Sequence, residues 1–171
     1  FICAAITKNR AGKELTDLCA LQREGAIAIS DDGSSVDSGE LMSLALKQAR
    51  DNKIRVICHC EDKTISNRGV VNLGFTSTKL GLRGVSQESE YKRVQRDISL
   101  AEKNAATLHI AHISSKESVD LIRQAKKKGI NITCETAPHY FALSEEDVWG
   151  FDTDKKMNPP LRSKEDVLAI K

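Results

Sequence analysis

The sequence predicts an α/β fold built around a parallel sheet. Short apolar runs suited to buried strands alternate with segments whose apolar residues recur at helical spacing, the pattern of parallel strands joined by crossover helices. Right-handed crossovers bring the carboxyl ends of such strands to one edge, where α/β enzymes hold their chemistry. Three polar strings are expected at that edge, namely Ser30-Asp31-Asp32-Gly33, Cys58-His59-Cys60-Glu61-Asp62 and His109-Ile110-Ala111-His112.

Five strands are predicted, over residues 2–7, 26–30, 54–58, 108–113 and 130–134. Helices are predicted over 14–21, from 37 or 38 to 49, from 87 to 101 and from 114 to 125, with a long glycine-containing loop after the third strand. Capping patterns open the helix at Ser114 to Glu117 and a last helix at Ser163 to Asp166. Such a sheet is either doubly wound or part of a barrel.

Composition limits the classes of function. Lys and Arg (26) nearly balance Asp and Glu (24), which argues against a nucleic-acid or anionic-membrane partner. No apolar run approaches the ~20 residues that span a bilayer. Five cysteines without a visible secretory signal favour the cytoplasm. Residues 1–171 are expected to form a single domain, and the start inside a strand at Phe1 and the stop within a helix at Lys171 predict an internal piece of a larger fold.

Side-chain alternation predicts which polar residues of the second and third strands face inward. In the second strand the small side chains share a face with Asp32, and they suit a crowded barrel interior. The isoleucines share the other face with Asp31 and suit packing under helices. In the third strand His59 lies opposite Cys58 and Cys60, which argues against a zinc site made of these three residues.

The same alternation in the fourth strand places Ile110 and His112 on one face and His109 on the other. Parity therefore predicts Asp32, His59 and His112 as one inward set. A carboxylate and two imidazoles at one point suit a divalent metal, and zinc is the first candidate. Taken singly, an Asp-Asp-Gly string is typical of a turn and a strand-end histidine is often structural. The joint placement at three successive strand ends favours the metal.

Seven segments spread along the chain carry a family resemblance: 25–33, His59-Cys60-Glu61-Asp62, the loop with Asn72, Gly74 and Leu80-Gly81-Leu82, Arg96-Asp97, His109 to Ser114, Glu135-Thr136-Ala137-Pro138-His139-Tyr140, and Lys156-Met157-Asn158-Pro159-Pro160-Leu161-Arg162. In these segments the chain resembles the bacterial class I dihydroorotases of the amidohydrolase superfamily. The resemblance covers essentially all 171 residues. It implies a partial (β/α)₈ TIM-type barrel, with this chain holding about the third to seventh strands.

The resemblance also implies roles for particular residues. Asp32 matches an aspartate that bridges two zinc ions, His59 and His112 match the histidines of the second ion, and Asn158 matches a substrate-contacting asparagine. Related hydantoinases, dihydropyrimidinases and allantoinases carry a carboxylated lysine where this chain has Asp32, and no lysine occurs in residues 30–33.

The rest of the implied site is expected outside this chain. The first-strand His-x-His pair is expected before Phe1, and the general acid–base aspartate of the last barrel strand is expected beyond Lys171. Hence no catalytic residue is expected within residues 1–171, and the isolated chain is expected to be inactive.

The implied activity is the reversible, zinc-dependent hydrolysis of the cyclic amide of (S)-dihydroorotate to N-carbamoyl-L-aspartate, in pyrimidine (UMP) biosynthesis. Two alternatives remain open. One is another cyclic-amide hydrolase of the hydantoinase or allantoinase kind, and the other is a non-catalytic dihydroorotase-like subunit that supports aspartate carbamoyltransferase. The partner hypotheses are the small-molecule substrate, a second copy in a homodimer, and aspartate carbamoyltransferase.

Overall fold

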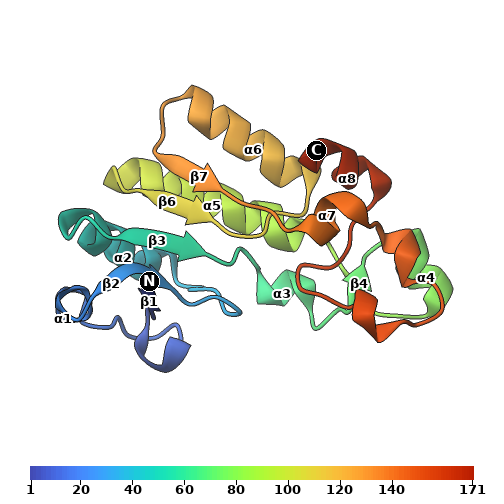
Figure 1. Ribbon diagram of the computed structural model, residues 1–171, viewed down its shortest axis with the longest axis horizontal. Coiled ribbons are helices and arrows are strands. Elements are labelled where there is room, and N and C mark those ends of the chain that lie inside the picture. Colours follow the sequence, from blue (N-terminus) through green and yellow to red (C-terminus); the bar gives the residue numbers. More distant parts are fainter.

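A five-stranded parallel sheet forms the centre of the computed structural model, which describes residues 1–171 (Figure 1). Its strands lie side by side in chain order: β1 (Ile2–Ala4), β2 (Ala26–Ser30), β3 (Arg55–Cys58), β6 (Leu108–Ile110) and β7 (Ile132–Cys134). All five predicted strands are confirmed. The first, fourth and fifth are shorter than predicted by two residues or more, since the first and fourth end at Ala4 and Ile110 and the fifth begins at Ile132.

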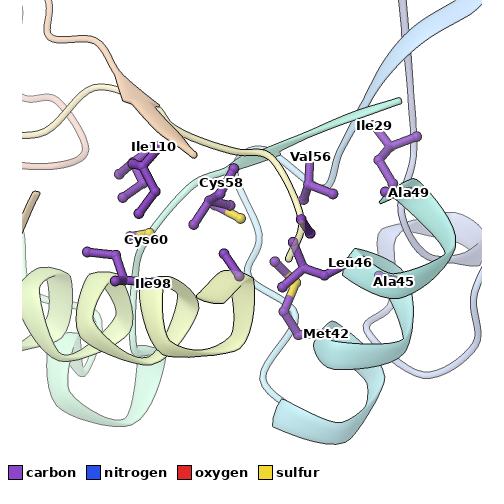
Figure 2. Close-up of a cluster of buried hydrophobic side chains, with 14 of the residues drawn as sticks. Ile29, Met42, Ala45, Leu46, Ala49, Val56, Cys58, Cys60, Ile98 and Ile110 are labelled. Carbon is purple, nitrogen blue, oxygen red and sulfur yellow. The ribbon is translucent and has the colours of Figure 1, made fainter. Parts of the chain in front are cut away.

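The long helices all pack on one face of this sheet. They are α2 (Gly39–Asp51), α5 (Glu88–Asn104) and α6 (Lys116–Lys127), preceded by the short α1 (Leu18–Arg23). Their apolar side chains share one core with a single face of the strands, part of which is drawn in Figure 2. A doubly wound sheet would carry helices on both faces. Sequentially ordered parallel strands whose connecting helices cover one face form a barrel wall, which decides between the two predicted alternatives.

Strand register shows which side chains face the helices. One row across β2, β3, β6 and β7 belongs to the core and consists of Ile29, Val56, Leu108 and Ile132. The next row points the other way and consists of Ser30, Ile57, His109 and Thr133. Ile29 thus packs under the helices as predicted. Ile27 does not, being 55% exposed, and the register of β1 against β2 is irregular where that strand begins.

The predicted long loop after β3 is an ordered excursion. It contains α3 (Lys63–Ser66), β4 (Val71–Asn72), α4 (Phe75–Leu80) and β5 (Gly84–Val85), and β4 pairs with β5 in parallel. Two of its glycines permit close approach of the backbone. A Cβ on Gly69 would lie 2.5 Å from the carbonyl oxygen of Gly84, and one on Gly84 would lie 2.6 Å from the Cα of Leu73. No other residue fits at either position.

The remaining elements are short: η1 (Lys8–Arg10), α7 (Pro138–Ala142), η2 (Glu145–Val148), η3 (Thr153–Lys155) and α8 (Lys164–Ile170). The predicted capping box at Ser163 is confirmed, because Ser163 Oγ accepts from the Asp166 N–H at 3.2 Å and Asp166 Oδ2 accepts from the Ser163 N–H at 3.1 Å. The capping box predicted for α6 is wrong, since Ser114 and Ser115 instead bond to the Glu90 carboxylate of α5. None of the helices combines the length and apolar character needed to cross a membrane.

Candidate metal centre

Three side chains converge beyond the carboxyl ends of β2, β3 and β6. They are Asp32, His59 and His112, and one ligand atom from each lies within 4.8 Å of the others. The closest pair is His59 Nδ1 and His112 Nε2, at 3.0 Å. Asp32 Oδ1 lies 3.4 Å from His112 Nε2 and 3.5 Å from His59 Nδ1. The structure therefore brings together the three residues that the sequence singled out.

The end of β2 separates two adjacent aspartates, as alternation predicts. Asp31 is buried and accepts hydrogen bonds from the backbone N–H groups of Ile6 and Thr7 at 2.9 and 3.1 Å. It ties the end of β1 to β2. Asp32 turns to the cluster and accepts from the Gly33 N–H at 2.7 Å. Partial burial opposes ionisation of Asp32, but the Gly33 N–H and His112 outweigh it and lower the pKa of this carboxyl.

The segment after β3 holds His59 rigidly. Cys58 and Cys60 on either side are buried in the core beneath the sheet, where Figure 2 shows them near Ile98 and Ile110. His59 faces the opposite way, so the predicted alternation is confirmed here. Its ring is buried, and its Nε2 lies 2.9 Å from Oε2 of Glu61. Only Nδ1 is directed at the cluster.

His112 reaches the cluster by a different route from the one predicted. Ile110 faces the helices, so parity in β6 puts His109 on the inward face, and the predicted alternation is wrong for this strand. The strand ends at Ile110, and His112 has a φ of +39°, which turns its side chain out of the alternating pattern. His109 still stays outside the cluster. Its Nδ1 lies 2.7 Å from Thr133 Oγ1 and its Nε2 lies 3.5 Å from Glu135 Oε2.

Asn158 is connected to the cluster through Glu61. Its side-chain amide donates to Glu61 Oε2 at 3.0 Å, the same oxygen that binds His59. The segment that carries it is anchored on its carboxyl side, because Tyr140 donates to the Pro159 carbonyl at 2.7 Å and Leu161 is buried. The structure thus places Asn158 at the rim of the candidate centre. Its contact with a substrate remains a prediction.

Glu61 lies in a string that the sequence places at this edge, but no role was predicted for it. The hydrogen bond from His59, with those from Ser66 and Asn158, lowers the pKa of Glu61 to about 2 although burial raises it. The available signal was its position two residues after His59, which puts both on one face of an extended chain. His139 was also missed, and burial together with the neighbouring His112 lowers its pKa.

The general acid–base aspartate expected beyond Lys171 stays a prediction. Lys171 itself is exposed and follows the last residue of α8, and its backbone N–H donates to the Val167 carbonyl at 3.3 Å. The carboxylates that residues 1–171 do bring to the cluster are those of Asp32 and Glu61, and histidines engage both of them.

The donor set suits zinc. Zn²⁺ binds imidazole nitrogen and carboxylate oxygen, and a catalytic zinc has three protein ligands beside a position for water or substrate. Here two imidazole nitrogens and one carboxylate oxygen point at a common space. Because His59 Nε2 is bound to a carboxylate, Nδ1 can carry the lone pair that a metal requires.

Residues 1–118 match the model of the dihydro-orotase-like family. The chain belongs to this family. It is 52% identical over 166 residues to a dihydroorotase of Caldicellulosiruptor saccharolyticus, covering 97% of this chain and 39% of that protein. It is 48% identical over 171 residues to a dihydroorotase of Geotalea daltonii, covering 100% of this chain and 40% of that protein. The chain thus spans about two fifths of the length of these relatives.

Solved structures confirm the fold of this dihydro-orotase-like chain. The L-hydantoinase (dihydropyrimidinase) from Arthrobacter aurescens superposes with a TM-score of 0.80 at 18% identity, over 98% of this chain and 39% of that one. A D-hydantoinase from a Bacillus species, AR9, superposes with a TM-score of 0.74 at 21% identity, over 98% of this chain and 39% of that one. The chain is part of a TIM-type amidohydrolase barrel, as predicted. Its numbering as the third to seventh strands remains a prediction.

Proposed function

We propose that the full-length protein is a dihydroorotase, which hydrolyses the cyclic amide of (S)-dihydroorotate reversibly to N-carbamoyl-L-aspartate with zinc, in cytoplasmic pyrimidine biosynthesis. The observation that carries the proposal is the cluster of Asp32, His59 and His112 at adjacent strand ends in a chain of the dihydro-orotase-like family. Relatives named dihydroorotase at about 50% identity across nearly the whole chain support it.

Each residue of the cluster has a role in this proposal. Asp32, ionised at neutral pH, and the neutral rings of His59 and His112 would hold zinc, with Asp32 shared between two ions. Bound zinc lowers the pKa of a water ligand to about 7 and polarises a carbonyl oxygen. Because the histidines add no negative charge, the ligand set leaves positive charge at the metals, which favours an oxyanion on the attacked amide.

The proton-transferring group is proposed to lie beyond Lys171 in the full-length protein. The roles of the two carboxylates at the cluster support this, since Asp32 is proposed as a metal ligand and both oxygens of Glu61 are already hydrogen-bonded. Asn158 is proposed to contact the ring of the substrate from the rim of the site. Its amide oxygen remains available for that contact, because its nitrogen donates to Glu61.

The experiment is a turnover assay of the zinc-loaded full-length protein with dihydroorotate and with hydantoin as substrates. Turnover of dihydroorotate that is abolished in His59→Ala and retained in His109→Gln supports the proposal, because His109 is the strand-end histidine that does not join the cluster. Turnover of hydantoin alone would make the protein a hydantoinase-like enzyme. Zinc binding without turnover of either substrate would favour a non-catalytic subunit. Light scattering of the protein mixed with aspartate carbamoyltransferase would then test whether the two associate. Light scattering of the protein alone would test whether it forms a homodimer.

A further inference from the structure

Glu61 connects three separate parts of the candidate site. Its Oε2 receives His59 Nε2 at 2.9 Å and the Asn158 amide at 3.0 Å, and its Oε1 receives Ser66 Oγ at 2.6 Å. Its backbone N–H donates to Ser35 Oγ at 3.2 Å. With both oxygens bonded and a side chain only 16% exposed, Glu61 has a fixed position.

The backbone around Glu61 is fixed by the same group that fixes His59. Ser35 Oγ donates to the His59 carbonyl at 2.7 Å while it accepts from the Glu61 N–H. Ser35 thereby ties the two residues to the loop that follows Asp32. The distance between the His59 ring and the Glu61 carboxylate is therefore set by backbone as well as by side-chain contacts.

A carboxylate at Nε2 determines what the other ring nitrogen can do. An ionised carboxylate only accepts hydrogen bonds, so Nε2 of His59 must carry the ring proton. Nδ1 then offers a lone pair, and it faces His112 Nε2 at 3.0 Å and Asp32 Oδ1 at 3.5 Å. A carboxylate on the far nitrogen of a metal-binding histidine fixes both tautomer and ring orientation.

His112 provides an internal contrast. Its Nδ1 is buried and has no hydrogen-bond partner. The far nitrogen of its ring is thus held by no side chain, whereas the far nitrogen of His59 is held by a charged acceptor. Of the two histidines, only His59 has a carboxylate on the ring nitrogen that faces away from the cluster.

The same oxygen also orients Asn158. Because the Glu61 carboxylate can only accept, the Asn158 amide must present its NH₂ group to Glu61 and its Oδ1 away from it. Asn158 is thus offered to a ligand as an acceptor, which suits a ligand that carries an N–H group.

We infer that Glu61 is a positioning residue: it holds His59 in the tautomer that offers Nδ1 to a metal, and it holds Asn158 with its amide oxygen available to an N–H of the substrate. This inference rests on the proposed metal site. Glu61 itself binds neither metal nor substrate in this inference, and its carboxylate couples the metal ligand His59 to the substrate-contacting Asn158.

The test compares two isosteric variants of the full-length protein, Glu61→Gln and Glu145→Gln. Glu145 is a matched control, because its carboxylate also accepts an asparagine amide, that of Asn72 at 2.9 Å, but has no histidine partner. Affinity for Zn²⁺ alone is measured by competition with a chromophoric chelator. Removal of a carboxylate that orients a ligand weakens metal affinity about 10- to 100-fold. We expect that loss for Glu61→Gln and wild-type affinity for Glu145→Gln.

A second readout separates positioning from a loss of folding. In the Co²⁺-substituted protein the visible absorption spectrum reports the ligand geometry, so it should change in Glu61→Gln and superpose on wild type in Glu145→Gln. If Glu61→Gln does not unfold cooperatively, Glu61→Asp replaces it, since its shorter side chain draws the carboxylate away from Nε2. Weakened affinity in that variant supports the inference.

The outcomes distinguish this inference from the proposed function. Wild-type zinc affinity and an unchanged cobalt spectrum in the folded Glu61 variant, with metal lost in Asp32→Ala, would overturn the positioning role and leave the metal site standing. Wild-type metal content in Asp32→Ala would overturn the metal site, and the inference with it.

Discussion

The buried pair of Glu90 and Arg162 provides a quantitative prediction for the substitution Glu90→Gln. Arg162 is 2% exposed and its Nη2 lies 3.8 Å from Glu90 Oε2. Glu90 also accepts from the backbone N–H groups of Ser114 and Ser115, each at 3.0 Å. Glutamine has nearly the same shape but no charge, so the substitution leaves the guanidinium buried without its counter-ion.

The size of the destabilisation follows from the hydrogen bonds that remain when glutamine replaces Glu90. Both backbone N–H groups at the start of α6 bond to Oε1, and an amide oxygen in that place can accept them. Arg162 keeps its hydrogen bonds to Asn72 Oδ1 and to the Val85 carbonyl, both at 2.9 Å. The loss is therefore mainly the charge. Breaking a buried pair from one side costs roughly 3–5 kcal/mol, and the surviving hydrogen bonds place Glu90→Gln near about 3 kcal/mol.

The assay is urea-induced unfolding of the full-length protein, followed by far-ultraviolet circular dichroism, with Glu165→Gln as the control. Glu165 Oε1 lies only 2.7 Å from Lys116 Nζ, closer than the buried pair, yet both side chains are exposed to solvent. Exposed pairs contribute little, so the control should match wild type. A Glu90→Gln protein destabilised by less than about 1 kcal/mol, or a control destabilised as strongly, would refute the argument that burial decides the effect.

The effect should also depend on pH. Burial would raise the pKa of Glu90, but Arg162 and the hydrogen bonds from the serines outweigh it and lower the pKa below its usual 4.5. A carboxyl whose pKa is lower in the folded state stabilises the fold above its unfolded pKa and loses that contribution as the pH falls through the folded one. The difference in stability between wild type and Glu90→Gln should thus be full at pH 7 and shrink below pH 4.5.

Three further predictions concern the site in the full-length protein. Asp32→Ala should lower zinc content at both proposed positions, because a shared ligand serves each ion; full two-zinc stoichiometry by elemental analysis would exclude that role. His109→Gln should leave zinc content unchanged, since His109 bonds to Thr133 outside the cluster; a loss of metal would place His109 among the ligands. Asn158→Ala should remove one hydrogen bond to the substrate, worth roughly 1–3 kcal/mol, and so lower kcat/KM for dihydroorotate about 10- to 100-fold, with zinc content unchanged. Wild-type kinetics would exclude a side-chain contact.

The sequence predicted the barrel strands because they are apolar, short and separated by amphipathic helices. Alternation also predicted the side-chain directions of Asp32 and His59 correctly, although it placed Ile27 under the helices, where it does not lie. It was wrong along β6, where Ile110 faces the helices and His109 faces inward, because the prediction assumed that the strand continues to His112, which instead lies two residues beyond it with a left-handed backbone. The alternation of residues 108–112 contains no signal that the strand ends at Ile110. His112 thus joins the predicted cluster, but by a backbone geometry that alternation did not predict.

The excursion between β3 and α5 could not be predicted in the same way. Its strands have two residues each, too few for any periodicity to appear. They are held by contacts distant in sequence, such as Arg162 to Asn72 and to Val85. The role of Glu61 was hidden for a related reason. Its partner Asn158 lies 97 residues further along the chain, and only the fold brings the two together.

The buried pair and the candidate metal centre are linked through the backbone of His112. A non-glycine residue in the left-handed region costs of order 1–3 kcal/mol and persists only when its surroundings fix it. Here both flanks are fixed: the Ala111 N–H donates to the Cys58 carbonyl at 3.0 Å, and the Ser114 N–H donates to Glu90 at 3.0 Å. The Glu90 carboxylate, held by Arg162, therefore helps to maintain the turn that aims His112 Nε2 at the cluster. The buried pair of Glu90 and Arg162 therefore helps to offset the conformational free energy of the left-handed backbone at His112. The pair that stabilises the fold thus also helps to set the geometry of the candidate centre.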